Sequence, residues 1–106
     1  MHRYANMKHW KYGAGDSRTV IFKALACEHR IHILEALKYG EQNVSEIASL
    51  FSIHPSVVSR HLAILQMAGL VVSKKKGAEV YYRLSSDDVL NLIKDAEKIA
   101  KERNTY

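Results

Sequence analysis

Residues 43–69 have the sequence NVSEIASLFSIHPSVVSRHLAILQMAG, which contains two short helix patterns separated by three residues. The first pattern follows Asn43, and Glu46 stands where a capping box requires an acidic partner for the Asn cap. The second begins with Pro55 in its first turn, where the missing N–H costs nothing, and it keeps apolar residues on one face as far as Gly69. Because the connecting residues 52–54 leave room only for a turn, the pair predicts a helix-turn-helix.

Two further helices are expected before this unit. Asp16 or Ser17 can cap a short amphipathic helix whose apolar positions recur with helical spacing. A second helix is expected from about Glu28 to Lys38, and it should end at Gly40, which can adopt the left-handed cap conformation. The apolar positions of the first helix are Val20, Ile21, Ala24 and Leu25.

Beyond the helix-turn-helix, the hydrophobic period changes from that of a helix to that of a strand. Leu70–Val72 is β-prone, residues 74–78 (KKKGA) predict a charged turn, and the side chains of Glu79–Leu84 alternate between two faces. Ser85 or Ser86 then caps a final helix that has two aspartates in its first turn. The expected fold is therefore mainly α with a β-hairpin wing, in the order α-α-α-α-β-β-α.

Length and composition predict one folded domain in the cell interior. The chain has 106 residues, of which 47% are hydrophobic, and this suffices for one modest core. We divide it into a basic, aromatic N-terminal arm at residues 1–15 and a folded domain at residues 16–104. No apolar run is long enough to cross a bilayer, and the arm lacks the apolar stretch of a signal peptide. We therefore expect a cytoplasmic protein with no membrane partner.

The positive charge is concentrated in one part of the chain. The net charge is +5, and residues 52–78 contain Arg60 and three lysines but no Asp or Glu. Net charge alone does not distinguish DNA from RNA or from an acidic membrane surface. A basic patch that coincides with a helix-turn-helix and a hairpin favours double-stranded DNA as the partner.

The second helix of the helix-turn-helix carries the first candidate site. Ser56, Ser59, Arg60 and Ala63 have the spacing i, i+3, i+4 and i+7, so they project from one surface. In a major groove, Arg can bind a guanine edge, Ser a base or phosphate, and Ala a thymine methyl group. On an isolated helix an ordinary solvated face would be the simpler interpretation, but the hairpin that follows favours DNA. The candidate DNA contacts here are His54, Ser56, Val57, Ser59, Arg60 and Ala63.

The hairpin carries the second candidate site. Lys74, Lys75 and Lys76 are expected at its tip, where they would bind phosphates and add affinity and salt dependence but little sequence information. Arg83 lies on the polar face of the second expected strand and is a further candidate phosphate contact. The alternative interpretation of such a charge run is a solvated turn.

An ordered series of motifs resembles one family. The motifs are Ala24-Leu25-Ala26, Arg30-Ile31-His32-Ile33-Leu34, Val58-Ser59-Arg60-His61-Leu62, Ala68-Gly69-Leu70-Val71 and Val80-Tyr81-Tyr82-Arg83-Leu84. Over about residues 17–102 the chain is similar to the ArsR-type transcriptional repressors. This resemblance implies a winged helix-turn-helix domain that forms a homodimer through its first and last helices. It also implies that the fourth helix of each subunit enters successive major grooves of a palindromic operator.

The residues themselves allow such a homodimer. Apolar stripes on the first and last helices exceed what one small core should need, so they are candidates for a dimer seam. The stripes consist of Val20, Ile21 and Ala24 on the first helix and of Ile93, Ala96 and Ala100 on the last.

The metal sites of this family do not carry over to this chain. Many members bind a metal through cysteines in the third helix or through Asp and His pairs in the last helix. Here residues 44–51 contain no Cys and residues 87–104 contain no His. The spacing of the other candidate ligands does not define a zinc site, so we expect neither a metal nor a cofactor. These other candidates are Cys27, His29, His32, His2 and His9.

Cys27 is a candidate thiol sensor, because it falls where the second expected helix begins. A thiol at a helix N-terminus can react as thiolate, whereas the alternative is a small buried apolar residue. As the single cysteine, it cannot form an internal disulfide. An unidentified inducer, or none, is equally compatible with the sequence. His54 is expected to cap the helix beside DNA, and His61 to be packed or bound to phosphate.

Two classes of function other than DNA binding remain as alternatives for this sequence. The sequence has no Gly-rich phosphate loop, no paired carboxylates near a His and no nucleophile motif, so we do not expect an enzyme. A winged helix that binds a protein or RNA without specific readout of duplex DNA is the main alternative, because one fold can host all of these functions.

Overall fold

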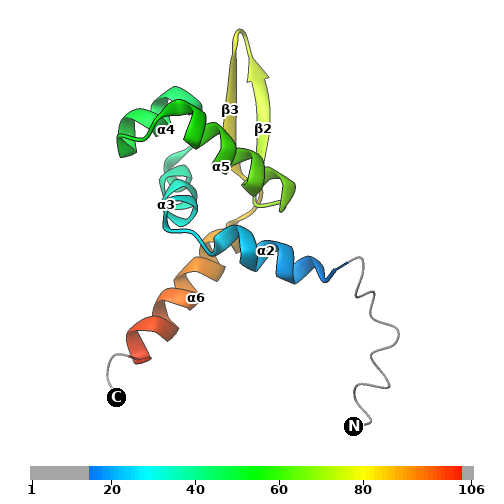
Figure 1. The fold of residues 1–106 in the computed structure, drawn as a ribbon, viewed down its shortest axis with the longest axis vertical. Helices are drawn as coiled ribbons and strands as arrows, with labels where there is room; N and C mark the ends of the chain where they lie inside the picture. Colours follow the sequence, from blue (N-terminus) through cyan, green and yellow to red (C-terminus); the bar gives the residue numbers. More distant parts are fainter. Residues whose placement is uncertain (1–14, 104–106) are drawn as a thin grey trace.

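A computed structural model of the protein describes residues 15–103 (Figure 1). The arm predicted at residues 1–15 therefore lies outside the described residues except for Gly15, as does Asn104 at the end of the predicted domain. The elements are helices α2 (Ser17–Leu25) and α3 (Glu28–Ala36), the 3₁₀ helix η2 (Leu37–Tyr39), strand β1 (Gln42–Asn43), helices α4 (Val44–Phe51) and α5 (Pro55–Met67), strands β2 (Val71–Lys76) and β3 (Glu79–Leu84), and helix α6 (Asp87–Arg103).

The caps at the helix starts confirm the sequence signals. Asp16 caps α2, because its carboxylate accepts a hydrogen bond from the backbone N–H of Arg18 at 2.9 Å. At the start of α4, the Asn43 side chain accepts from the Glu46 N–H at 2.8 Å, and the Glu46 carboxylate accepts from the Asn43 N–H at 2.9 Å. Pro55 occupies the first turn of α5, and Ser86 Oγ accepts from Asp88 N–H at the start of α6. Local hydrogen bonds at α2, α4 and α6, and the proline at α5, thus fix where these four helices begin.

The expected end of the second helix is wrong in detail. α3 ends at Ala36 and continues as the 3₁₀ turn η2, and Gly40 has φ 131° and ψ 176° rather than left-handed helical angles. The extended ψ directs the chain into β1 two residues later, so Gly40 ends the turn and begins an extended segment. Its positive φ still favours glycine. The left-handed C-cap occurs instead at Ser52, after α4, with φ 54° and ψ 42°.

The hairpin belongs to a three-stranded antiparallel sheet with the order β1-β3-β2. β1 was not predicted, because two residues are too few to show an alternating pattern. The placement of Lys74, Lys75 and Lys76 in the turn is also wrong, since all three lie in β2 and the turn consists of Gly77 and Ala78. Gly77 has φ +63°, a conformation that glycine adopts without a steric cost in a tight hairpin turn.

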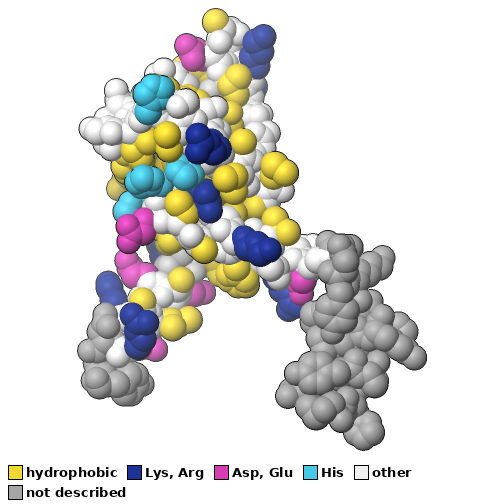
Figure 2. Space-filling model, in the orientation of Figure 1, with side chains coloured by type: hydrophobic (Ala, Val, Ile, Leu, Met, Phe, Trp, Pro, Cys, Tyr) yellow, Lys and Arg dark blue, Asp and Glu magenta, His cyan; other side chains and the backbone are white. Residues whose placement is uncertain are grey.

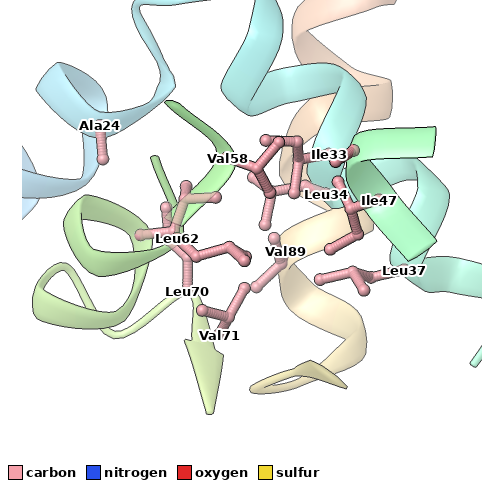
Figure 3. Packing of buried hydrophobic residues seen from close by; sticks show 12 residues of the cluster. Ala24, Ile33, Leu34, Leu37, Ile47, Val58, Leu62, Leu70, Val71 and Val89 are labelled. Atoms are coloured by element: carbon pink, nitrogen blue, oxygen red, sulfur yellow. The ribbon is translucent and has the colours of Figure 1, made fainter. Parts of the chain in front are cut away.

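One apolar core joins the helices to the base of the sheet (Figure 3). Its seven largest fully buried side chains come from α3, α4, α5 and β2. Each such burial contributes about 1.5–3 kcal/mol, so this packing fixes α5 against the rest of the domain. The seven residues are Ile33, Leu34, Ile47, Val58, Leu62, Leu65 and Val71.

The arrangement separates two surfaces of the domain. The β2–β3 hairpin projects at one end, beside α4 and α5, whereas α2 and α6 lie towards the other end (Figure 1). α6 extends away from the body of the domain, and its residues 94–103 are all exposed. Among the described residues, no helix is both long enough and apolar enough to span a membrane.

Candidate nucleic-acid interface

The outward face of α5 presents the side chains that the sequence placed there. Val58, Leu62 and Leu65 have 0% exposure and hold the inner face of the helix in the core. The opposite face is solvent-exposed and consists of Ser56, Ser59, Arg60 and Ala63. Val57 is half-buried, so it offers only part of its side chain to a ligand. The helix therefore combines a fixed inner face with a small, polar and basic outer face.

His54 is the N-cap of α5, as expected. Its ring Nδ1 accepts a hydrogen bond from the backbone N–H of Ser56 at 3.1 Å and lies 2.8 Å from Ser56 Oγ. Both residues are exposed at the start of the helix. The unpaired N–H groups of a helix N-terminus attract anions, so this end of α5 suits contact with a phosphate group.

Packing against α5 distinguishes the two faces of the hairpin. Gln66 of α5 donates from Nε2 to the hydroxyl of Ser73 in β2 at 3.1 Å. Because side chains alternate along a strand, Lys75 shares the face of Ser73, whereas Lys74 and Lys76 point to the other face. The structure therefore brings Lys75 to the α5 side of the hairpin and separates Lys74 and Lys76 from it.

Lys76 has partners that the sequence did not indicate. Its ammonium forms an ion pair with Glu41, which precedes β1, and lies 5.5 Å from the centroid of the Tyr81 ring. Residues 52–78 contain no acidic side chain, but folding places Glu41 next to Lys76, although the two residues are 35 positions apart in sequence. The ammonium of Lys76 is thus less available to a phosphate than that of Lys75.

Arg83 also lies on the face away from α5, since it pairs in register with Val72. Its guanidinium Nη1 donates to the Leu84 carbonyl at 3.2 Å, and the residue is exposed. Its exposure agrees with the predicted polar face of the strand. Its direction places it with Lys74, apart from the outer face of α5.

The face of the domain shown in Figure 2 gathers Lys, Arg and His side chains over α5, α3 and α2, and acidic side chains lie towards its edges. One contact within this region was not foreseen: the Arg30 guanidinium of α3 lies 3.3 Å from His61 Nδ1 on α5. No short-range sequence pattern indicates it, because the two residues are 31 positions apart and belong to different helices.

α2 and α6 leave apolar side chains in solvent. Phe22 is 58% exposed and Ile99 68%, and an open cavity of about 520 Å³ lies between α2, α3 and α6. The predicted seam needs correction at one residue, because Ala24 is only 2% exposed and belongs to the core. Ile21 and Ile93 are half-buried and pack against that core, whereas Val20, Ala96 and Ala100 are exposed.

Cys27 is the N-cap residue of α3, as its position in the sequence predicted. It is half-buried, and its side chain forms no capping hydrogen bond. Within residues 15–103, no three side chains of His, Cys, Asp or Glu converge in a way that could hold a metal ion.

The fold and the exposed helix define a class of protein: a winged helix-turn-helix domain. Solved structures of this class superpose on the chain. One is the solution structure of Mb0332 from Mycobacterium bovis, a homodimeric winged helix-turn-helix DNA-binding domain described as a possible ArsR-family regulator. It has a TM-score of 0.75 and is 33% identical to this protein, over 83% of this chain and 82% of that one. The structure of HlyU from Vibrio cholerae has a TM-score of 0.70 and 36% identity over 85% of this chain and 96% of that one.

Sequence comparisons identify the family. Residues 27–73 match the model of the bacterial regulatory proteins of the arsR family. The transcriptional activator HlyU of Vibrio cholerae is 36% identical over 80% of this chain and 79% of its own length. The transcriptional repressor SmtB of Mycobacterium tuberculosis is 33% identical over 82% of this chain but 64% of its own length, so the chain spans slightly less than two thirds of that relative. The chain belongs to the arsR family of bacterial regulatory proteins.

Proposed function

We propose that the protein is a sequence-specific, double-stranded DNA-binding transcriptional regulator that binds a palindromic operator as a homodimer. The observation that carries the proposal is the outer face of α5, where Ser56, Ser59, Arg60 and Ala63 are exposed on a helix whose inner face is fully buried. A rigid helix with this face fits the major groove, which admits one helix and distinguishes all four base pairs. Lys75 on the neighbouring hairpin face adds a phosphate contact.

The exposed apolar surface of α2 and α6 supports the homodimer. Large apolar side chains on two neighbouring elements would be costly on a monomer, and a second copy would cover them through a two-fold interface. The homodimeric Mb0332 domain supports the same assembly. A two-fold dimer presents two α5 helices to one duplex, so its operator should be an inverted repeat with half-sites about one helical turn apart.

We further propose that the regulator is a repressor. We also propose that it is cytoplasmic and that it uses no cofactor. The relatives support both directions of regulation, because HlyU is named an activator whereas SmtB is named a repressor. The repressor of an arsenical resistance operon in Bacillus subtilis, 35% identical over 70% of this chain and 71% of its own length, adds support for repression. A dimer of this size acts most simply by covering a promoter.

Selection from a pool of random duplexes tests the proposal. The expected result is enrichment of one inverted repeat after several rounds of binding and amplification. A pool that stays random would overturn sequence-specific readout. It would favour the alternative of a winged helix that binds a protein or RNA.

Lys75→Ala is expected to weaken binding to the selected operator and to a scrambled duplex by the same factor. Each lysine would neutralise about one phosphate and the homodimer loses two, so the slope of log K against log salt should become less steep by about 1.8. Anisotropy titrations at several salt concentrations measure both quantities. Lys74→Ala, on the opposite face of the same strand, removes the same charge, is the matched control and should change the slope less. A loss confined to the operator would contradict the assignment of Lys75 to phosphate.

We also propose that Cys27 is a thiol sensor that controls DNA binding. Its support is its position as the N-cap of α3 and its partial exposure. Comparison of reduced and peroxide-treated protein on the operator tests the role. Cys27→Ser should bind equally under both conditions, and equal binding by both forms of the wild-type protein would exclude the sensor.

A further inference from the structure

The Arg30 side chain connects three helices. Its Nε donates to the Ala24 carbonyl at 2.5 Å, and its Nη2 donates to the Lys23 carbonyl at 3.3 Å. These carbonyls lie in the last turn of α2, where a positive charge is favourable, and the Lys23 carbonyl also accepts from the Ala26 N–H at 3.3 Å. The third branch of the guanidinium, Nη1, lies 3.3 Å from His61 Nδ1 on α5. One side chain of α3 therefore holds the end of α2 and the flank of α5.

The chemistry of this contact defines the state of the His61 ring. Arginine has only donors, so Nδ1 of His61 must accept the hydrogen bond, and the imidazole must be neutral with its proton on Nε2. A proton on Nδ1 would leave two donors facing each other and place two like charges in contact. The neutral imidazole is thus a requirement of the contact itself.

We propose that Arg30 is a positioning residue for DNA recognition: by linking the end of α2 to a neutral His61, it holds α5 in the orientation that base readout requires. The inference rests on the proposed function, since it concerns how that DNA-binding helix is placed. His61 adjoins Arg60, the residue assigned to base readout, so a shift of this part of α5 would displace the Arg60 side chain. Small displacements of a side chain that forms two hydrogen bonds to one base remove much of its specificity.

The charged surroundings of His61 make this link sensitive to pH. From α3, Arg30 and His29 face the ring, and the His29 ring contacts it edge-on with centroids 5.6 Å apart. From its own helix, Arg60 adds a further positive charge, whereas α2 contributes the carbonyls that hold Arg30. Partial burial and these cations lower the pKa of His61 below its usual 6.5. The link is therefore intact at neutral pH and is lost as the pH falls through this lowered pKa.

Acidification would have two opposite effects on DNA binding. Protonated histidines attract phosphates and strengthen binding to every duplex, whereas the loss of the Arg30–His61 link weakens base readout. The ratio of the affinity for the selected operator to that for a scrambled duplex removes the first effect. This ratio is the quantity that reports on the orientation of α5.

Two pairs of variants separate positioning from charge and from general stability. Arg30→Lys keeps the charge but cannot reach α2 and His61 together, because it lacks the planar fork of the guanidinium. His61→Leu removes the hydrogen-bond acceptor. His61→Asn keeps an acceptor, the amide oxygen, near the position of Nδ1, and this amide does not titrate near neutral pH. His32→Asn is the matched control, because His32 is an exposed histidine of α3 that stacks on Phe51 instead.

The test is the operator-to-scrambled affinity ratio of these variants from about pH 8 down to the lowest pH at which the protein remains folded, a range that extends below the usual histidine pKa of about 6.5. At about pH 8 the ratio should fall about tenfold in Arg30→Lys and His61→Leu, which lose a hydrogen bond to a charged group, and be largely retained in His61→Asn. On acidification it should fall in the wild-type protein and in His32→Asn, and less in His61→Asn. Nitrogen-15 shifts of the wild-type His61 ring, measured without DNA, should show an unprotonated Nδ1 and a proton on Nε2.

An unchanged ratio in Arg30→Lys, or the same acid response in His61→Asn as in the wild-type protein, would overturn the inference while leaving the proposed function intact. A proton on Nδ1 of His61 at neutral pH would overturn it as well. A wild-type protein with no preference for any duplex at about pH 8 would overturn the proposed function and this inference together.

Discussion

Replacement of Ile99 by glutamate is expected to dissociate the homodimer. Ile99 is 68% exposed on α6, beyond the part of the helix that packs on the core, so the substitution should leave the fold of each subunit intact. Burial of a large apolar side chain contributes about 1.5–3 kcal/mol, and two-fold symmetry removes that contribution from both subunits. The dimer dissociation constant should therefore rise by roughly a hundredfold or more. Sedimentation equilibrium at micromolar protein measures the change.

Leu50→Glu is the control for this experiment. Leu50 is 59% exposed on α4, so the substitution adds the same charge to an apolar side chain of similar exposure outside α2 and α6. This variant should remain a dimer. Phe22→Glu, on α2, should behave like Ile99→Glu. Dimeric Ile99→Glu and Phe22→Glu proteins would show that another surface forms the interface.

Arg60→Ala is expected to weaken operator binding and to relax the sequence preference at one position of each half-site. A pair of hydrogen bonds from arginine to one base contributes about 1–3 kcal/mol to discrimination, so the operator affinity should fall by roughly five- to hundredfold per subunit. Binding to scrambled DNA should change much less, because only a charge is lost there. Titrations on operators that carry each of the four bases at the affected position measure the relaxation.

Arg83→Ala is the matched variant for Arg60→Ala, since both replace an exposed arginine. Arg83 lies on the hairpin face away from α5, so its loss should reduce affinity only slightly and equally for all duplexes. Equal losses on operator and scrambled DNA for Arg60→Ala would contradict its assignment to base readout.

Most of the helical architecture could be predicted, because local interactions determine it. The reciprocal hydrogen bonds of Asn43 and Glu46 lie within one helical turn, and Pro55 acts on its own first turn. The outer face of α5 could be predicted for the same reason, because the spacing of its residues depends only on the geometry of one helix. The end of the second helix, which was expected at Gly40, was predicted less well, because the direction of the chain at Gly40 depends on β1, and β1 is stabilised by pairing with β3.

The contacts that define the candidate site depend on residues far apart in sequence. Lys76 meets Glu41 only after β1 has paired with β3, and Arg30 meets His61 only after α3 and α5 have packed together. The alternation of β2 distinguishes Lys75 from Lys74 and Lys76, but the side that faces α5 is known only from the Gln66–Ser73 hydrogen bond. Sequence patterns therefore identified the candidate residues, and folding determined which of them can act together.

Fluorescence anisotropy of the full chain on the selected operator and on a scrambled duplex, titrated at several salt concentrations, tests the central claim most directly. The account predicts that the operator binds at least a thousandfold more tightly near physiological salt, roughly the lower end of the range for specific regulators. It also predicts that binding to both duplexes weakens steeply as salt rises. Equal affinities for the two duplexes at every salt concentration would contradict the assignment of α5 to base readout.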